Sequence, residues 1–121
     1  MSESQFKRGD VVLVPFPFVT DFSKAKTRPA VVIQNDMGNL HSPNLILALI
    51  STSIPRKDYP FHYRIVVDSK SAKQSGLSQD SIVKAEIIIT IPKSCVVKKI
   101  GSFPKEEMEK IDQCLRVSLN L

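Results

Sequence analysis

The sequence predicts a mainly β fold, in which a small barrel of short strands is followed by one C-terminal α-helix. First, short runs rich in Val and Ile are bounded by Gly, Pro, Asn or Asp, which is typical of strands. Second, two runs, at residues 30–33 and 45–50, are apolar without interruption, as expected of strands covered on both faces. Third, a clear helical period occurs only near the end of the chain.

The chain of 121 residues, 42% of them hydrophobic, is long enough to bury one continuous core. It contains no linker, internal repeat or low-complexity tract, so a single domain over residues 1–121 is expected. The expected strands are Val11–Val14, Ala30–Ile33, Leu45–Ile50, Arg64–Val67, Ser81–Lys84, Ile87–Ile91 and Cys95–Ile100. Because closing short strands into a barrel removes exposed edges, an SH3-like barrel with a terminal helix is the simplest architecture.

The connections follow from turn chemistry. The segment from Phe18 to Thr27 is expected to be a loop, and residues 35–39 are expected to form a turn. Residues 69–75 suit a short helix or a turn before Gly76. The C-terminal helix is expected to begin near Pro104. Its apolar residues recur at spacings of three and four, at Met108, Ile111, Leu115 and Leu119.

The charge of the chain is uneven. Seventeen Lys and Arg against twelve Asp and Glu give +5. Residues 104–121 carry three basic and four acidic side chains, so the first 103 residues carry +6. A basic body favours polyanionic partners such as nucleic acid, although many basic proteins bind none.

The two cysteines, Cys95 and Cys114, lie in apolar surroundings without metal-binding spacing. They are expected to be buried thiols of a protein in a reducing compartment. The N-terminus has no apolar signal region, and no window is apolar enough to span a membrane, so a cytoplasmic location without membrane attachment is expected.

Most familiar catalytic motifs are absent, including phosphate-binding Gly-rich loops, zinc-binding HExxH and the GxSxG nucleophile motif. The informative stretch is TRPAVVIQND, residues 27–36, where Arg28 lies at the mouth of a strand. A guanidinium keeps its charge and matches two phosphate oxygens at once. From the spacing alone, Arg28 could equally pair with a carboxylate at the barrel rim.

Three segments together resemble the MazF/PemK family of toxin endoribonucleases: Lys7-Arg8-Gly9-Asp10-Val11, the TRPAVVIQND stretch, and the strand ending Ile50-Ser51-Thr52. The resemblance continues through Gly76, Asp80–Val83 and the closing helix, and PFPF at residues 15–18 is similar to the PemK-like branch. It implies a homodimeric SH3-like barrel of the MazF/PemK/CcdB type. It further implies an enzyme that cuts single-stranded RNA without metal or cofactor, leaving a cyclic phosphate, and that is blocked by a cognate antitoxin.

The resemblance also implies site residues. The catalytic arginine of the family falls on Arg28, and its catalytic threonine falls on Ser51, with Thr52 next to it. For both hydroxyls, capping of a strand end is an equally good alternative. A family pair credited with substrate binding and acid/base chemistry falls on Lys84 and Glu86, which alternatively form a surface ion pair.

Further basic residues are candidates for RNA binding: Lys24 and Lys26 in the loop before Arg28, and Arg56 and Lys57 in a loop that also carries aromatic rings. A solvated loop is the alternative for the latter pair. Because Ser51, Lys84 and Glu86 depart from the family pattern, a module that binds RNA or antitoxin without cleavage remains a second hypothesis. A gyrase poison of the CcdB type, which shares the barrel, is a third.

Overall fold

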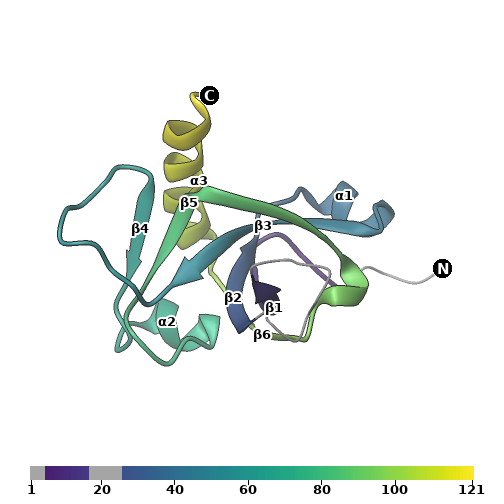
Figure 1. The fold of residues 1–121 in the computed structure, drawn as a ribbon, viewed down its shortest axis with the longest axis horizontal. Helices are drawn as coiled ribbons and strands as arrows, with labels where there is room; N and C mark the ends of the chain where they lie inside the picture. The colour runs from purple at the N-terminus through teal and green to yellow at the C-terminus, as the bar shows by residue number, and fades with distance from the viewer. Residues whose placement is uncertain (1–4, 17–25) are drawn as a thin grey trace.

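The structure is a computed structural model that describes residues 5–16 and 26–121. One antiparallel six-stranded sheet has the order β4-β5-β3-β2-β1-β6 and curls around a core (Figure 1). Its strands are β1 (Asp10–Phe16), β2 (Lys26–Val32), β3 (Asn44–Ser51), β4 (His62–Ile65), β5 (Ser81–Pro92) and β6 (Lys98–Ser102). The helices are α1 (Asp36–His41), α2 (Lys70–Ser75) and α3 (Lys105–Leu119), with a 3-10 turn, η2, at Lys93–Cys95. The predicted mainly β class with a C-terminal helix is confirmed.

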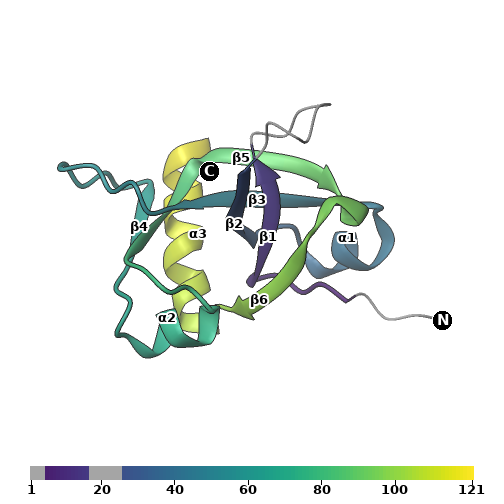
Figure 2. The ribbon, with the colours of Figure 1, turned by 60° about the horizontal axis from the view of Figure 1, so that its bottom comes forward.

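The two faces of the sheet have different surroundings, because side chains alternate along each strand. The face that we call helix-covered packs under α3, as Figure 2 shows. Its core includes Val11, Val31, Ala48, Ile50 and Val83 from the sheet and Met108, Ile111, Cys114 and Leu115 from α3. On the other face, which we call the open face, a second core is confined to one end: Phe6, Val12, Val14, Ala30, Val32, Leu45, Leu47 and Ile91.

The short helix α2 packs closely on β6 through two glycines. The predicted short helix before Gly76 is confirmed, with Ser69 as its N-cap, and it ends at Gly76 with a φ of +79°. A Cβ at Gly76 would lie 2.2 Å from the carbonyl oxygen of Ile100. A Cβ at Gly101 on β6 would lie 2.4 Å from the carbonyl oxygen of Gln74. Both positions therefore require glycine.

Two local expectations were wrong. Residues 36–41 form the helix α1 instead of a turn, because the Asn35 side chain caps it by accepting a hydrogen bond from the Gly38 amide at 2.7 Å. So short a helix carries no apolar period that a sequence pattern could reveal. The two strands expected at 81–84 and 87–91 are one strand, β5, with an irregularity between them.

Strand ends also differ from expectation. β4 begins two residues before Arg64, and Cys95 lies in η2 instead of a strand. Both cysteines are free, Cys114 buried and Cys95 half-buried, so burial is confirmed for one of them. Burial raises the pKa of the Cys114 thiol, which favours its neutral form. No helix of the described residues is long and apolar enough to cross a membrane.

Candidate nucleic-acid site

Arg28 lies on β2, on the open face of the sheet. It pairs across the ladder with Val14 of β1, and it has the same alternation as Ala30 and Val32, which belong to the open-face core. The Arg28 side chain itself is exposed. Within residues 5–16 and 26–121, no carboxylate lies at ion-pair distance from it. In this part of the chain, the alternative of a structural ion pair at the rim is therefore not observed.

Ser51 ends β3, the strand next to β2, and lies on the same face of the sheet as Arg28. The β2–β3 ladder runs from Val32 opposite Leu47 to Ala30 opposite Leu49, and it ends two residues before Arg28. Because side chains alternate along a strand, Ser51 has the same alternation as Leu47, which belongs to the open-face core. The Ser51 hydroxyl accepts a hydrogen bond from the Ser53 amide at 3.0 Å, so it caps the strand end. This bond does not use the hydroxyl hydrogen, which can be donated to a ligand.

Thr52 lies on the other side of the sheet from Ser51. It lines a cavity of about 200 Å³ together with Pro29 and Leu13, which pair with each other in the β1–β2 ladder. Pro29 follows Arg28 on β2, and its side chain therefore points away from the open face. The structure places Ser51 on the face of Arg28 and Thr52 on the other face.

Basic residues from neighbouring strands share the face of Arg28. Lys84 on β5 is paired with Leu49 on one side and with His62 of β4 on the other. Arg64 of β4 is paired with Ile82, which in turn is paired with Ser51. Lys26, two residues before Arg28, has the same alternation. Strands are about 4.8 Å apart, so these long side chains can contact one extended polyanion.

Glu86 lies in a bulge of β5 and is held by His62. The β3–β5 register jumps from Ala48 opposite Ile88 to Leu49 opposite Lys84, which leaves residues 85–87 as extra residues on β5. The His62 Nε2 atom lies 2.9 Å and 3.0 Å from the two carboxylate oxygens of Glu86. The alternative of a Lys84–Glu86 ion pair is thus corrected: the Glu86 carboxylate is hydrogen-bonded to His62.

Sequence reasoning missed His62 as a site residue. Its side chain is 9% exposed. The polar residues His62 and Arg64 alternate with the half-buried Tyr63 and the buried Ile65, a period of two that could have revealed both residues on one face. The contact with Glu86 joins residues 24 positions apart, and no local pattern predicts it.

The loop between β3 and β4, residues 52–61, projects from the body of the molecule beside β4 (Figures 1 and 2). It carries Arg56 and Lys57, both exposed. The rings of Tyr59 and Phe61 are stacked with centroids 5.1 Å apart, and each meets His62 edge-on. Between this loop and the open face lies a cavity of about 200 Å³.

Other features limit what the site can contain. Lys24 falls outside the described residues. Among residues 5–16 and 26–121, no group of three or more His, Cys, Asp or Glu side chains is placed to hold a metal ion.

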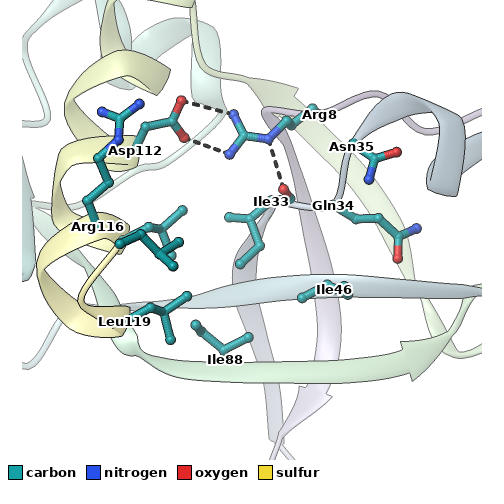
Figure 3. Close-up of a pocket in the computed structure, with 11 residues that line it drawn as sticks. Arg8, Ile33, Gln34, Asn35, Ile46, Ile88, Asp112, Arg116 and Leu119 are labelled. Atoms are coloured by element: carbon teal, nitrogen blue, oxygen red, sulfur yellow. Dashed lines mark hydrogen bonds and ion pairs between the residues drawn. The ribbon is translucent and has the colours of Figure 1, made fainter.

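A separate apolar cavity of about 450 Å³ lies between α3 and the sheet, on the helix-covered side (Figure 3). At its rim the Arg8 guanidinium contacts both carboxylate oxygens of Asp112, at 2.6 Å and 3.2 Å.

The open face thus combines fixed positive charge, a hydroxyl donor and a carboxylate–imidazole pair on adjacent strands. Guanidinium and ammonium groups bind phosphate oxygens, and a hydroxyl can donate to them. Glu86 and His62 can accept a proton. This is a combination suited to binding a phosphodiester and to transferring protons around it.

Comparison with known proteins identifies the family of the chain. Residues 7–119 match the family described as PemK-like, MazF-like toxin of type II toxin-antitoxin system. The chain is 38% identical over 115 residues to endoribonuclease EndoA of Bacillus subtilis, with 95% of both proteins covered.

Solved structures agree in fold. A mycobacterial endoribonuclease in complex with its cognate antitoxin superposes with a TM-score of 0.76 at 20% identity, covering 96% of both chains. A MazE–MazF complex of Deinococcus radiodurans superposes with a TM-score of 0.70 at 17% identity, again over 96% of both chains. This chain therefore belongs to the family of PemK-like, MazF-like toxins of type II toxin–antitoxin systems.

Proposed function

We propose that this chain is an endoribonuclease toxin that cleaves single-stranded RNA at a phosphate bound by Arg28 on the open face. The observation that carries the proposal is that Arg28 is exposed on the same face of the sheet as Ser51 and has no carboxylate partner among the described residues. The 38% identity to an endoribonuclease supports RNA over DNA gyrase as the target.

In the proposed reaction, the ribose 2′-oxygen attacks the adjacent phosphorus, and the bond from phosphorus to the 5′-oxygen breaks. The leaving 5′-oxygen takes a proton from water, so the products are a 2′,3′-cyclic phosphate and a 5′-hydroxyl. Arg28 stabilises the negative charge that grows on the non-bridging oxygens, and Ser51 donates a hydrogen bond to one of them. Lys84 holds a neighbouring phosphate as a point charge.

Proton transfer is assigned to Glu86. Its carboxylate accepts the proton of the 2′-hydroxyl, and His62 keeps the carboxylate in place through the contact at 2.9 Å. The β5 bulge lies two strands from Arg28, about 10 Å between backbones, a distance that the two side chains and a bound nucleotide can span. Thr52 has no part in this assignment because it lies on the opposite face.

The test is incubation of the purified protein with a long single-stranded RNA in the presence of EDTA. Discrete fragments are expected, with 5′ ends that polynucleotide kinase labels without prior phosphatase treatment. The Arg28→Ala variant is expected to be inactive with an unchanged fold. Retention of RNA without fragments would favour the module that only binds, and inhibition of supercoiling without RNA cleavage would favour a gyrase poison.

We further propose a homodimer formed by the helix-covered side. The groove in Figure 3 is lined by Ile33, Ile46 and Ile88 of the sheet and is flanked by α3, where Val117 and Leu119 are about half exposed. An isologous contact with a second copy would bury this apolar surface. Sedimentation is expected to show a dimer for the wild type and a monomer for Leu119→Glu.

A cognate antitoxin is proposed as the second macromolecular partner. Solved relatives include an endoribonuclease bound to its cognate antitoxin and MazE–MazF complexes. The +5 charge of this chain suits an acidic partner. Co-expression with a short acidic protein encoded immediately upstream is expected to abolish RNA cleavage and growth inhibition, and the purified pair is expected to elute as one complex. A cytoplasmic location is proposed as well, because the RNA target and the antitoxin are both found there.

A further inference from the structure

The cavity between the 52–61 loop and the open face lies on the same side of the sheet as Arg28. Its sheet wall consists of His62, Arg64 and Ile82. Ile82 is paired with Ser51 of β3, the strand next to β2. The cavity therefore begins one strand beyond Ser51, about 10 Å from the β2 backbone at Arg28.

The size and lining of this cavity suit a flat ring. Its volume of about 200 Å³ is below the roughly 300–1000 Å³ of pockets for drug-sized ligands. Ile54, Pro55 and Ile82 give it apolar walls, and the Tyr59 ring contributes an aromatic surface. The Tyr59 ring is already ordered by its stacking on Phe61, so little entropy is lost when a ligand stacks against it.

The polar groups of the lining can read the edge of a base. The Arg64 guanidinium and the Lys57 ammonium donate hydrogen bonds, and the Asp58 carboxylate accepts them. Bases in single-stranded RNA are recognised by this combination of stacking and hydrogen bonds to their edges. A protein side chain docked there would not need donors and acceptors around a flat apolar slot.

We propose that this cavity binds one unstacked nucleobase of the RNA, next to the phosphate held by Arg28, and that it sets the base preference at one position beside the cut. The inference rests on the proposed function. Asp58 and Arg64 select the base through its edge, and Tyr59 provides the stacking surface.

The first experiment is cleavage of a random-sequence RNA pool, with the fragment ends sequenced. Asp58→Asn is expected to relax the base preference roughly 5- to 100-fold at one position flanking the cut and to leave the other positions unchanged. Asp68→Asn, an equal charge change in the exposed turn after β4, is the matched control and is expected to keep the wild-type profile. An unchanged profile in Asp58→Asn, or a change spread over all positions, overturns the proposal.

The second experiment does not depend on cleavage. Binding of the protein to a random pool of oligonucleotides with 2′-methoxy groups is measured and the bound fraction sequenced. Tyr59→Ala is expected to lower affinity roughly 5- to 100-fold, whereas Tyr59→Phe keeps the ring and the affinity. If the wild type cuts no RNA, the proposed function fails, and a base preference that Asp58→Asn removes still supports the cavity. If these variants lose only antitoxin binding, the cavity binds protein and the inference is wrong.

Discussion

The Glu86 carboxylate, in a bulge of β5, lies 2.9 Å from the His62 Nε2 atom on the adjacent strand β4. Lys84, two residues away on the same strand, is not its partner. The contact fixes a group that would otherwise be mobile, because the bulge removes Glu86 from the regular ladder. The orientation of Glu86 therefore depends on a residue of another strand.

The first prediction concerns this contact. His62→Ala is expected to lower the single-turnover cleavage rate through Glu86, so in the Glu86→Gln background the same change has little further effect. The stability change should be small, within about 1 kcal/mol apart from lost packing, because Glu86 is 41% exposed. Rates of the four proteins in the double-mutant cycle give the coupling. Additive losses would show that His62 does not act through Glu86.

The second prediction concerns Arg28. Arg28→Ala is expected to lower the cleavage rate on the order of 10²–10³-fold, as for removal of a group that stabilises developing charge. Arg28→Lys should recover part of the lost cleavage rate, because the ammonium keeps the positive charge but cannot donate the two parallel hydrogen bonds of a planar guanidinium. The unfolding curve should match that of the wild type because the side chain is exposed. A cleavage rate that survives Arg28→Ala would contradict the proposed site.

The third prediction separates two adjacent hydroxyls. Ser51→Ala is expected to slow cleavage roughly 10- to 100-fold, the contribution of one hydrogen bond to a charged group. Thr52→Ala is expected to cleave RNA at nearly the wild-type rate, because Thr52 lines the cavity on the other face. Both variants can be compared in one single-turnover assay. The reverse order of effects would place the catalytic hydroxyl at Thr52.

The fourth prediction concerns the close approach of α2 and β6. Gly76→Ala must adopt a left-handed conformation and overlaps the Ile100 carbonyl, so the loss in unfolding free energy should exceed the roughly 1–2 kcal/mol of the conformation alone. Gly38→Ala is the comparison: its Cβ meets the Gln34 side chain instead of a backbone carbonyl, and Gly38 does not have a positive φ, so a smaller loss is expected. Urea unfolding of both variants measures the difference. Equal losses would argue against the tight α2–β6 contact.

The fifth prediction concerns acid stability. The Arg8 amide donates to the Asp36 carboxylate at 2.7 Å and holds the pKa of Asp36 below its usual value. A carboxyl with a lowered pKa stabilises the fold above its unfolded pKa, and this stability is lost as the pH falls through the folded pKa. In Asp36→Asn, the free energy of unfolding, measured by urea unfolding at a series of acidic pH values, should therefore fall less steeply with decreasing pH than in the wild type. An equally steep fall in the variant would show that Asp36 is not a cause of the acid sensitivity.

Local patterns predicted much of the fold. The uninterrupted apolar runs at 30–33 and 45–50 became the central strands β2 and β3, and the period after Pro104 became α3. These elements can be predicted from local sequence. A strand buried on two faces shows an uninterrupted apolar run, and a helix buried along one side shows apolar residues at spacings of three and four. α1 left no such signal because it depends on a single cap at Asn35.

The site could be predicted less completely. The family resemblance pointed to Arg28 and Ser51 as candidates, and the structure places both on the open face. The separation of Ser51 from Thr52 required the register of three strands. The pairing of Glu86 with His62 and the cavity at Tyr59 required the path of the 52–61 loop, which no periodicity encodes.

The bulge at residues 85–87 divides the pairing of β5 into two ladders, one on each side of the bulge. Residues 82–84 pair with both β3 and β4, whereas residues 88–92 pair with β3 alone. Each ladder keeps its own register, so a residue gained or lost within the bulge need not displace the pairing on either side. Glu86 thus occupies a point where the chain can tolerate changes in length, and its carboxylate can be re-aimed over the open face while the barrel stays intact.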